Sequence, residues 1–349
     1  MNLSWKKLEE GGSKLRTPKR RLVFKMRLLQ FVYCAAAARA LQLPTTWGSS
    51  MVLEANAPNK LWGLDASGST VSVTAFGRTY NATADSSGAW SVLIAAQPKS
   101  TLPSTISIAS TSGGAATLSD VLVGYTVVCS GQSNMELNVG ATYNYVTETA
   151  DADALGATLR IFQVAMLDAY AGATTPQTNL SASIPWTRAS SASVSSFSAL
   201  CYFFGAELVK KHPDTPIGLL ASSWGGTAIQ PWMSPAALNS CKGAAPAPTH
   251  EELAASADPG LATVGRLALL SRGGSKDAFP TNGSCLYNSM IFPLMQNPRR
   301  MLGWYQGVRL LPKRAHLHAL PYPPPPPEPL PCRSPTLEIP WGISASSPP

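Results

Sequence analysis

The sequence contains few charged residues. Asp, Glu, Lys and Arg together make up 13% of the chain, about half of the ~25% that is usual in soluble proteins. The net charge of +8 lies at the two ends, because residues 1–27 hold nine basic residues and residues 308–349 hold four more. The body between them is close to neutral, which excludes a basic platform for nucleic acid.

Histidine is also scarce, and the chain shows no metal-binding pattern. Its four histidines and six cysteines are scattered, without the close ligand spacing that zinc sites use. We therefore expect neither a metal nor a cofactor.

No apolar run is long enough for a transmembrane helix, which needs ~20 residues. One short run, Met26–Cys34, follows the basic N-terminus and leads into an alanine stretch that ends at Ala40. This combination is typical of a secretory signal, and we assign residues 1–45 to it, with an amphipathic helix or an organelle transit peptide as the alternative. Three triplets fit the N-glycosylation pattern and favour the same route: those beginning at Asn81, Asn179 and Asn282. We expect a secreted or lumenal glycoprotein, as in a lysosome, and not an integral membrane protein.

Four cysteines lie in the body of the chain: Cys129, Cys201, Cys241 and Cys285. Four cysteines allow three sets of disulfide pairings, and the sequence does not decide among them.

Residues 46–120 have the pattern of a small β-sandwich domain. Short β-like segments follow one another at 8–12-residue spacing, separated by Gly and Asp turns. The expected strands are Thr70–Phe76, Thr79–Ala84, Ala89–Ile94 and Thr105–Ala109. No acidic cluster or histidine occurs here, so we expect this domain to support or bind rather than to react.

Residues 121–307 change to an α/β rhythm. The run Val121–Cys129 is almost entirely apolar, which is typical of a strand buried on both faces. Further strands are expected at Leu159–Val164, Ile217–Ser222 and Arg300–Tyr305, and helices at about Glu148–Ala157, Ser196–Lys211 and Leu286–Met295. Strands that alternate with helices predict a doubly wound, parallel α/β sheet.

The last 42 residues, 308–349, break this pattern. They contain 13 of the 30 prolines, a composition that favours polyproline II and cannot form a core. We expect a disordered tail, which a proline-recognising partner domain could bind.

The hexapeptide Ser130–Met135 (SGQSNM) directly follows the apolar run Val121–Cys129. Ligands of open α/β sheets gather at the carboxyl ends of strands, and a serine on a tight glycine turn there exposes its hydroxyl next to backbone N–H donors. Ser133 is therefore a candidate nucleophile. In the alternative interpretation, Ser133 or Asn134 only caps a helix.

Two later blocks have a similar position. Gly225–Thr227 (GGT) follows an expected strand, and Trp304–Gly307 (WYQG) lies at the end of another. Together with SGQSNM, in this order, they resemble the sialate O-acetylesterase family of the SGNH-type hydrolases. The resemblance covers residues ~50–307, because Trp62-Gly63 and Gly88–Val92 also match the N-terminal β domain of that family.

The resemblance implies a role for six residues. Ser133 would be the nucleophile that takes the acetyl group from a sugar hydroxyl, an O-acetylated sugar or sialoglycan being the substrate. The oxyanion hole would use the N–H of Ser133 and one from Gly225 or Gly226, and the substrate would be bound by Gln132, Asn134 and Gln306.

The chain departs from the family at two points. The third block of the family continues to an asparagine that completes the oxyanion hole, whereas Val308 and Arg309 follow Gly307 here. The family also carries an Asp-x-x-His whose histidine deprotonates the serine, and no Asp-x-x-His occurs in this sequence. A serine needs such a base. We do not expect any of the four histidines to replace it: His212, His250, His316 and His318.

We therefore expect an incomplete SGNH-like domain at residues 121–307, in a truncated or misassembled esterase that is nearly inactive. Two alternatives remain open. The chain could be a non-catalytic protein that keeps a sugar-binding pocket, or an interaction protein that acts through its proline-rich tail.

Overall fold

The computed structural model describes residues 40–240, 255, 280 and 282–306. Several sequence predictions fall outside these residues. They are most of the signal segment, Cys241, His250, the residues after Gln306 and the whole proline-rich tail.

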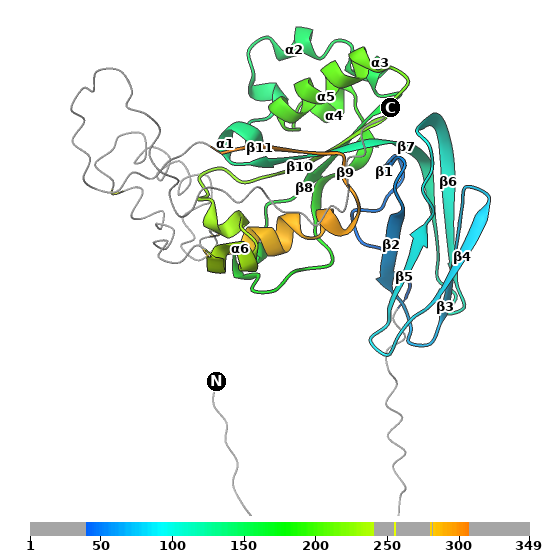
Figure 1. The fold of residues 1–349 in the computed structure, drawn as a ribbon. Helices are drawn as coiled ribbons and strands as arrows, with labels where there is room; N and C mark the ends of the chain where they lie inside the picture. Colours follow the sequence, from blue (N-terminus) through cyan, green and yellow to red (C-terminus); the bar gives the residue numbers. More distant parts are fainter. Residues whose placement is uncertain (1–39, 241–254, 256–279, 281, 307–349) are drawn as a thin grey trace, which may run out of the picture. The chain divides into compact units, whose positions relative to one another are not determined.

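The first part of the described chain consists of β-strands (Figure 1). β2 (Asn59–Leu64) and β5 (Ala89–Ile94) form a two-stranded antiparallel sheet. The larger sheet contains β1, β3, β4 and β6, whose bounds are Val52–Glu54, Thr70–Ala75, Arg78–Thr83 and Ser100–Ser110. The predicted strands at 70–76, 79–84 and 89–94 are thus observed within a residue or two of their expected ends. Their alternating polar and apolar residues place one face of each strand in the core.

The longest strand, β7 (Ala115–Gly131), joins the two halves of the fold. Its first half pairs with β6, antiparallel, and its second half pairs with β10 (Ile217–Ser223) and β11 (Met301–Tyr305), both parallel. Because the strand runs without a break through position 120, the predicted division between residues 46–120 and 121–307 falls inside one element. The small, separate β-sandwich is therefore not confirmed.

The second half is a mixed α/β sheet. Its strands lie in the order β11-β7-β10-β8-β9, where β8 is Leu159–Val164 and β9 is Ala182–Arg188. All neighbours are parallel except β9, which pairs antiparallel with β8 at the edge. The predicted α/β class is confirmed, and the one strand that periodicity missed is this antiparallel edge.

Helices cover both faces of this sheet (Figure 1). The predicted helix at 196–211 is observed as α5 (Ala199–Lys211), which begins at a cap formed by the Ser198 hydroxyl. The segment predicted as a helix at 148–157 contains only one helical turn, at Ala152–Leu155, which ends at Gly156. On one side lie α2 (Tyr145–Glu148), α3 (Ala152–Leu155), α4 (Ser191–Val194) and α5, and on the other α6 (Pro235–Ser240) and the helical turns at Tyr287–Ile291 and Leu294–Gln296. None of the described helices is long and apolar enough to cross a membrane.

The central strands are buried on both faces, as their apolar runs predict. In β7, Val128 belongs to the first core cluster, whereas Val127 and Cys129 belong to the second. In β10, Leu220 belongs to the first cluster and Leu219 to the second. The first cluster continues beneath the N-terminal strands through Val71, Val73 and Ile106. Both halves of the molecule therefore contribute residues to this first cluster.

A buried ion network lies at the midpoint of β7. The side chain of Arg160 is fully buried, and its guanidinium lies 3.2 Å from the carboxylate of Asp120, which also pairs with Arg188 at 2.7 Å. Burial alone would raise the pKa of Asp120, but the hydrogen bonds from Arg188 and Ser50 and the two guanidinium charges hold it below its usual value. Burial lowers the pKa of Arg160, and Asp120 opposes this effect.

Replacing Asp120 with asparagine should destabilise the fold by about 2–3 kcal/mol, because a buried guanidinium would lose its counter-ion. Asparagine tolerates the left-handed backbone of this position (φ 57°). The loss of stability would therefore come from the missing charge and not from strain in the backbone. Urea unfolding of the two chains measures the difference. The matched control is Asp214→Asn, at an exposed ion pair with Lys99, where the change should be much smaller because solvent screens the pair. Equal effects at the two positions would contradict the prediction.

Candidate functional site

The three sequence blocks meet at the carboxyl end of β7. In the sheet, Ser130 lies between Ser222 of β10 and Trp304 of β11, and Gly131 lies between Ser223 and Tyr305. Two backbone hydrogen bonds extend the contact beyond the strands, one from Gln132 to Tyr305 (3.1 Å) and one from Trp224 to Gly131 (3.1 Å). The three blocks therefore lie together at one edge of the sheet.

A sharp turn presents Ser133 at this edge. Gly131 has φ 142°, and a Cβ added to it would lie 2.0 Å from the carbonyl oxygen of Tyr305, so only glycine fits between β7 and β11 here. Ser133 is the first residue of a single helical turn, α1 (Ser133–Glu136). Ser133 and Asn134 are exposed, whereas Gln132 is buried. The chain thus buries the turn and leaves the candidate nucleophile accessible.

The second block lies against Ser133. A Cβ added to Gly225 would be 3.5 Å from the Cβ of Ser133, which is van der Waals contact. Gly226 has the left-handed conformation with φ 77°, which allows the chain to turn sharply there. Thr227 holds the turn in place because its hydroxyl donates to the carbonyl of Trp224 (2.6 Å) and accepts from the indole of Trp232 (2.8 Å).

Glu136 is a part of the site that the sequence interpretation missed. Its carboxylate accepts a hydrogen bond from the backbone N–H of Gly225, which was one of the two predicted oxyanion donors. The signal was present in the sequence, since residues three apart share one face of a helix and Glu136 follows Ser133 by three. Because the Gly225 donor is already engaged in this structure, Gly226 is the better candidate of the two glycines.

The third block reaches the second through Gln306. Its side-chain amide donates to the carbonyl of Thr227 (3.0 Å), while its Oε1 is buried without a partner among the described residues. The Oε1 of Gln132 is in the same state. Trp304 packs edge-on against Trp232, with the ring centroids 5.6 Å apart. Gln132 and Gln306 therefore each offer an unused acceptor near the turn.

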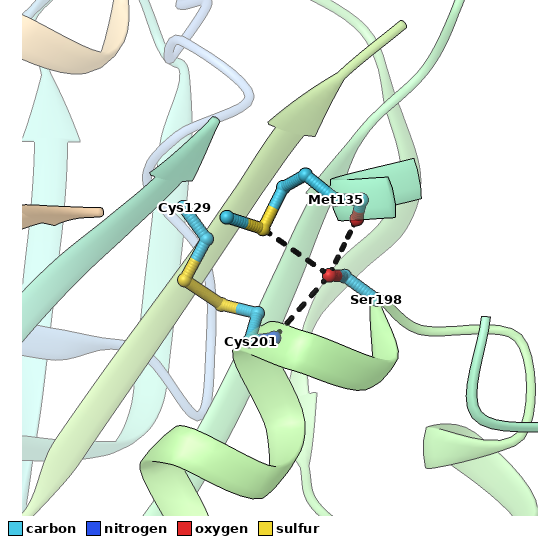
Figure 2. Close-up of a disulfide and its surroundings, with 4 residues drawn as sticks. All are labelled: Cys129, Met135, Ser198 and Cys201. Atoms are coloured by element: carbon cyan, nitrogen blue, oxygen red, sulfur yellow. Dashed lines mark hydrogen bonds between the residues drawn. A yellow bond between two sulfur atoms is a disulfide. The ribbon is translucent and has the colours of Figure 1, made fainter. Parts of the chain in front are cut away.

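A disulfide close to the turn connects β7 to α5 (Figure 2). Cys129, at the end of β7, is bonded to Cys201 in the first turn of α5. Ser198, the cap of α5, donates from its hydroxyl to the carbonyl of Met135 (2.6 Å) and accepts from the N–H of Cys201 (3.4 Å). The start of α5 is thus tied both to β7 and to α1. Among the described cysteines, the pairing is therefore Cys129 with Cys201, and Cys285 is a buried free thiol.

The described residues supply no histidine to Ser133. His212 lies at the exposed C-terminal end of α5, whose N-terminal end contacts α1. A helix of 13 residues is ~20 Å long, so His212 is too far away to act as a base. The described part of the chain also contains no group of three or more side chains that could hold a metal ion.

A serine exposed on a glycine turn at the carboxyl end of a central strand is typical of serine-dependent α/β hydrolases. Comparison with known families identifies the particular one. Residues 124–306, more than half of the chain, match the family described as carbohydrate esterase, sialic acid-specific acetylesterase. The chain belongs to this family.

Individual relatives agree with this assignment. The sialate O-acetylesterase of Homo sapiens is 31% identical over 196 residues, which is 54% of this chain and 32% of the human protein. That of Rattus norvegicus is 34% identical over 214 residues, 58% of this chain and 38% of the rat protein. A solved carbohydrate acetylesterase from Xanthomonas citri has 28% identity and a TM-score of 0.59, covering 77% of this chain and 51% of that one. The chain thus spans about a third of the length of the curated relatives it matches.

Proposed function

We propose that the site at Ser133 hydrolyses acetyl esters on sugar hydroxyls, with O-acetylated sialic acid as the sugar. The observation that carries this proposal is the contact between the exposed Ser133 and the Gly225–Gly226 turn, because a nucleophile and its oxyanion donors must lie this close together. The family supports the choice of an acetylated sugar.

The chemistry is acyl transfer in two steps. The Ser133 oxygen attacks the acetyl carbonyl, the serine proton passes to a base, and the tetrahedral oxyanion is held by the N–H groups of Ser133 and Gly226. Collapse of this intermediate releases the sugar hydroxyl, which takes up a proton, and leaves an acetyl group on Ser133. Water then attacks the acetyl-serine and releases acetate. Each oxyanion donor typically contributes ~10²–10³ in rate.

We propose that Gln132, Asn134 and Gln306 bind the sugar. The unpaired Oε1 atoms of Gln132 and Gln306 can accept hydrogen bonds from sugar hydroxyls, and the exposed amide of Asn134 lies next to the nucleophile in sequence. Asn134 is exposed, whereas both Oε1 atoms are buried, so the side chains of Gln132 and Gln306 would have to turn outward to reach a sugar hydroxyl.

We propose that the chain with this sequence turns over slowly. No Asp-x-x-His occurs in its 349 residues, and a serine hydroxyl attacks poorly without a base. The Glu136 carboxylate on the Gly225 N–H adds a second obstacle, because a negative charge beside the oxyanion opposes the transition state. The same two observations favour the second candidate, a non-catalytic sugar-binding protein.

The missing base suggests an experiment in which imidazole is supplied in solution. Acetate release from O-acetylated N-acetylneuraminic acid should be slow with the purified chain and should rise about tenfold with imidazole, which recovers part of the ~10²–10⁴ that a positioned base contributes. Ser133→Ala should release acetate no faster than the uncatalysed reaction, with or without imidazole. Identical rates for the two proteins in both conditions would establish the non-catalytic alternative, and a fast Ser133-dependent rate without imidazole would refute the proposed lack of a base.

We also propose that the protein passes through the secretory route. The Cys129–Cys201 disulfide needs an oxidising compartment to form and persist. Among the glycosylation triplets, the one at Asn81 is a better acceptor than the one at Asn282, because Asn81 is exposed on β4, whereas the amide nitrogen of Asn282 already donates to the carbonyl of Ala171.

A further inference from the structure

A pocket lies outside the site at Ser133. It has a volume of about 520 Å³, within the ~300–1,000 Å³ range of small-molecule sites. Its walls are the outward face of the β2–β5 sheet, the segment Gln42–Pro44, the loop at 178–179 and Gln296. None of its lining residues belongs to the three blocks around Ser133.

The alternation of β2 and β5 explains which side chains enter this pocket. Leu61 and Val92 point into the core. Because side chains alternate along a strand, the residues next to each of them in the sequence point outward. These include Lys60 and Trp62 on β2 and Ser91 on β5, and all three line the pocket. Trp62 and Ser91 are direct cross-strand neighbours.

Trp62 provides a fixed aromatic surface. Its indole N–H donates to the carbonyl of Thr178 (3.2 Å), which holds the ring between the sheet and the loop, and the side chain is only partly buried. The face of an indole carries negative charge density and attracts the weakly positive C–H groups on one side of a sugar ring. Trp62 also packs against the first core cluster, and the part of its ring that stays exposed is available to a ligand.

Two amide side chains are oriented by hydrogen bonds that leave one function of each without a partner among the described residues. The Oδ1 of Asn179 accepts from the N–H groups of Thr45 (2.8 Å) and Leu180 (2.9 Å), so its NH₂ group remains as a donor. The NH₂ of Gln296 donates to the carbonyl of Phe292 (3.2 Å), so its Oε1 remains as an acceptor. A donor and an acceptor held in this way suit a ligand with several hydroxyl groups.

The pocket contains one side chain of each charge, Lys60 and Asp85. Asp85 accepts hydrogen bonds from the N–H and the hydroxyl of Ser87 and from the N–H of Ala89, which hold its pKa below the usual value and keep it ionised within its own turn. Among the described residues, no carboxylate lies within ion-pair distance of the Lys60 ammonium. Lys60 can therefore pair with the carboxylate of a ligand that lies away from Asp85.

From these observations we infer that the pocket at Trp62 is a second sugar-binding site, which holds an acidic sugar of the sialic acid type by its ring face, its hydroxyls and its carboxylate. The choice of a sialic acid rests on the proposed function, whereas binding of a sugar does not. The site would keep a sialoglycan on the protein while Ser133 acts on an acetyl group elsewhere on the same glycan.

The test is binding of free N-acetylneuraminic acid to the whole chain, made in a host that adds no N-glycans and followed by saturation-transfer NMR. We expect a Kd on the order of 1 mM, typical of a shallow small-ligand site. Trp62→Ala should weaken binding at least tenfold. Ser91→Tyr, which places a larger side chain in the pocket directly opposite Trp62, should do the same, and Lys60→Gln should abolish the preference for N-acetylneuraminic acid over galactose.

The matched control is Leu102→Tyr, at an exposed apolar position on β6 outside the pocket, which should bind like the parent chain. Ser133→Ala should also bind normally, so that loss of ester hydrolysis and loss of this site are separate results. Undiminished binding by both Trp62→Ala and Ser91→Tyr would overturn the inference. So would a glycan found on Asn179 in protein from a glycosylating host, because that glycan would occupy the pocket covalently.

Discussion

Replacing Gly131 with alanine should cost the fold about 4 kcal/mol or more, which is a large part of the ~5–15 kcal/mol that stabilises a typical domain. The added Cβ would lie 2.0 Å from the carbonyl oxygen of Tyr305, at a backbone φ of 142°. Neither the φ angle nor the overlap can be relieved without separating β11 from β7, and this pairing holds the third block beside the nucleophile turn.

Thermal unfolding measures the effect, and a loss of this size should lower Tm by about 10 °C. Two glycines provide graded controls. Gly77 also has positive φ (73°) but nothing within 4 Å of an added Cβ, so Gly77→Ala should cost only about 1 kcal/mol. Gly172 has neither feature, and Gly172→Ala should be close to neutral. A Gly131→Ala chain as stable as the Gly172→Ala chain would show that β11 does not pair with β7 in solution.

Removing the disulfide should have an effect of similar size. Cys129 and Cys201 are 72 residues apart, and a closed loop of this length restricts the unfolded chain enough to contribute about 4 kcal/mol. The double variant Cys129→Ala, Cys201→Ala should therefore unfold at a clearly lower urea concentration than the parent. A reducing agent should lower the stability of the parent and leave that of the double variant unchanged.

The remaining described cysteine supplies the control. Cys285 is fully buried, and burial raises the pKa of its thiol to about 11, so it should not react with alkylating agents in the folded protein. Cys285→Ala should retain the full sensitivity to reducing agent. Peptide mapping that fails to find Cys129 joined to Cys201, or a parent chain that is indifferent to reduction, would contradict the pairing.

Local patterns were sufficient to predict most of the strands and the edge at which the site lies. Val121–Cys129 is apolar because both faces of β7 are covered, and Ile217–Ser222 and Leu159–Val164 follow the same rule. Such runs depend on burial alone, which leaves its mark on each residue in turn. Ser133, Gly225 and Gln306 could be expected at one edge because parallel strands bring their carboxyl ends together.

Contacts between distant residues were decided only by the tertiary structure. The sequence allowed three sets of cysteine pairings, and β7 and α5 had to be packed together before Cys129 and Cys201 could be joined. The engagement of Gly225 by Glu136 also depends on two segments 89 residues apart in the chain. No periodicity records which partner a side chain meets across such a distance.

The sequence by itself determined the family, the α/β class and the candidate nucleophile, because these depend on motifs and on burial patterns that are local in the chain. Only the tertiary structure showed that β7 continues from the N-terminal sheet into the central one, which no boundary at residue 120 anticipates. It alone placed Lys60, Trp62 and Asn179 around one pocket. The physical reason is the same in each case: pairing and packing between remote segments are properties of the folded chain as a whole, since each contact forms only when all the elements around it are in place.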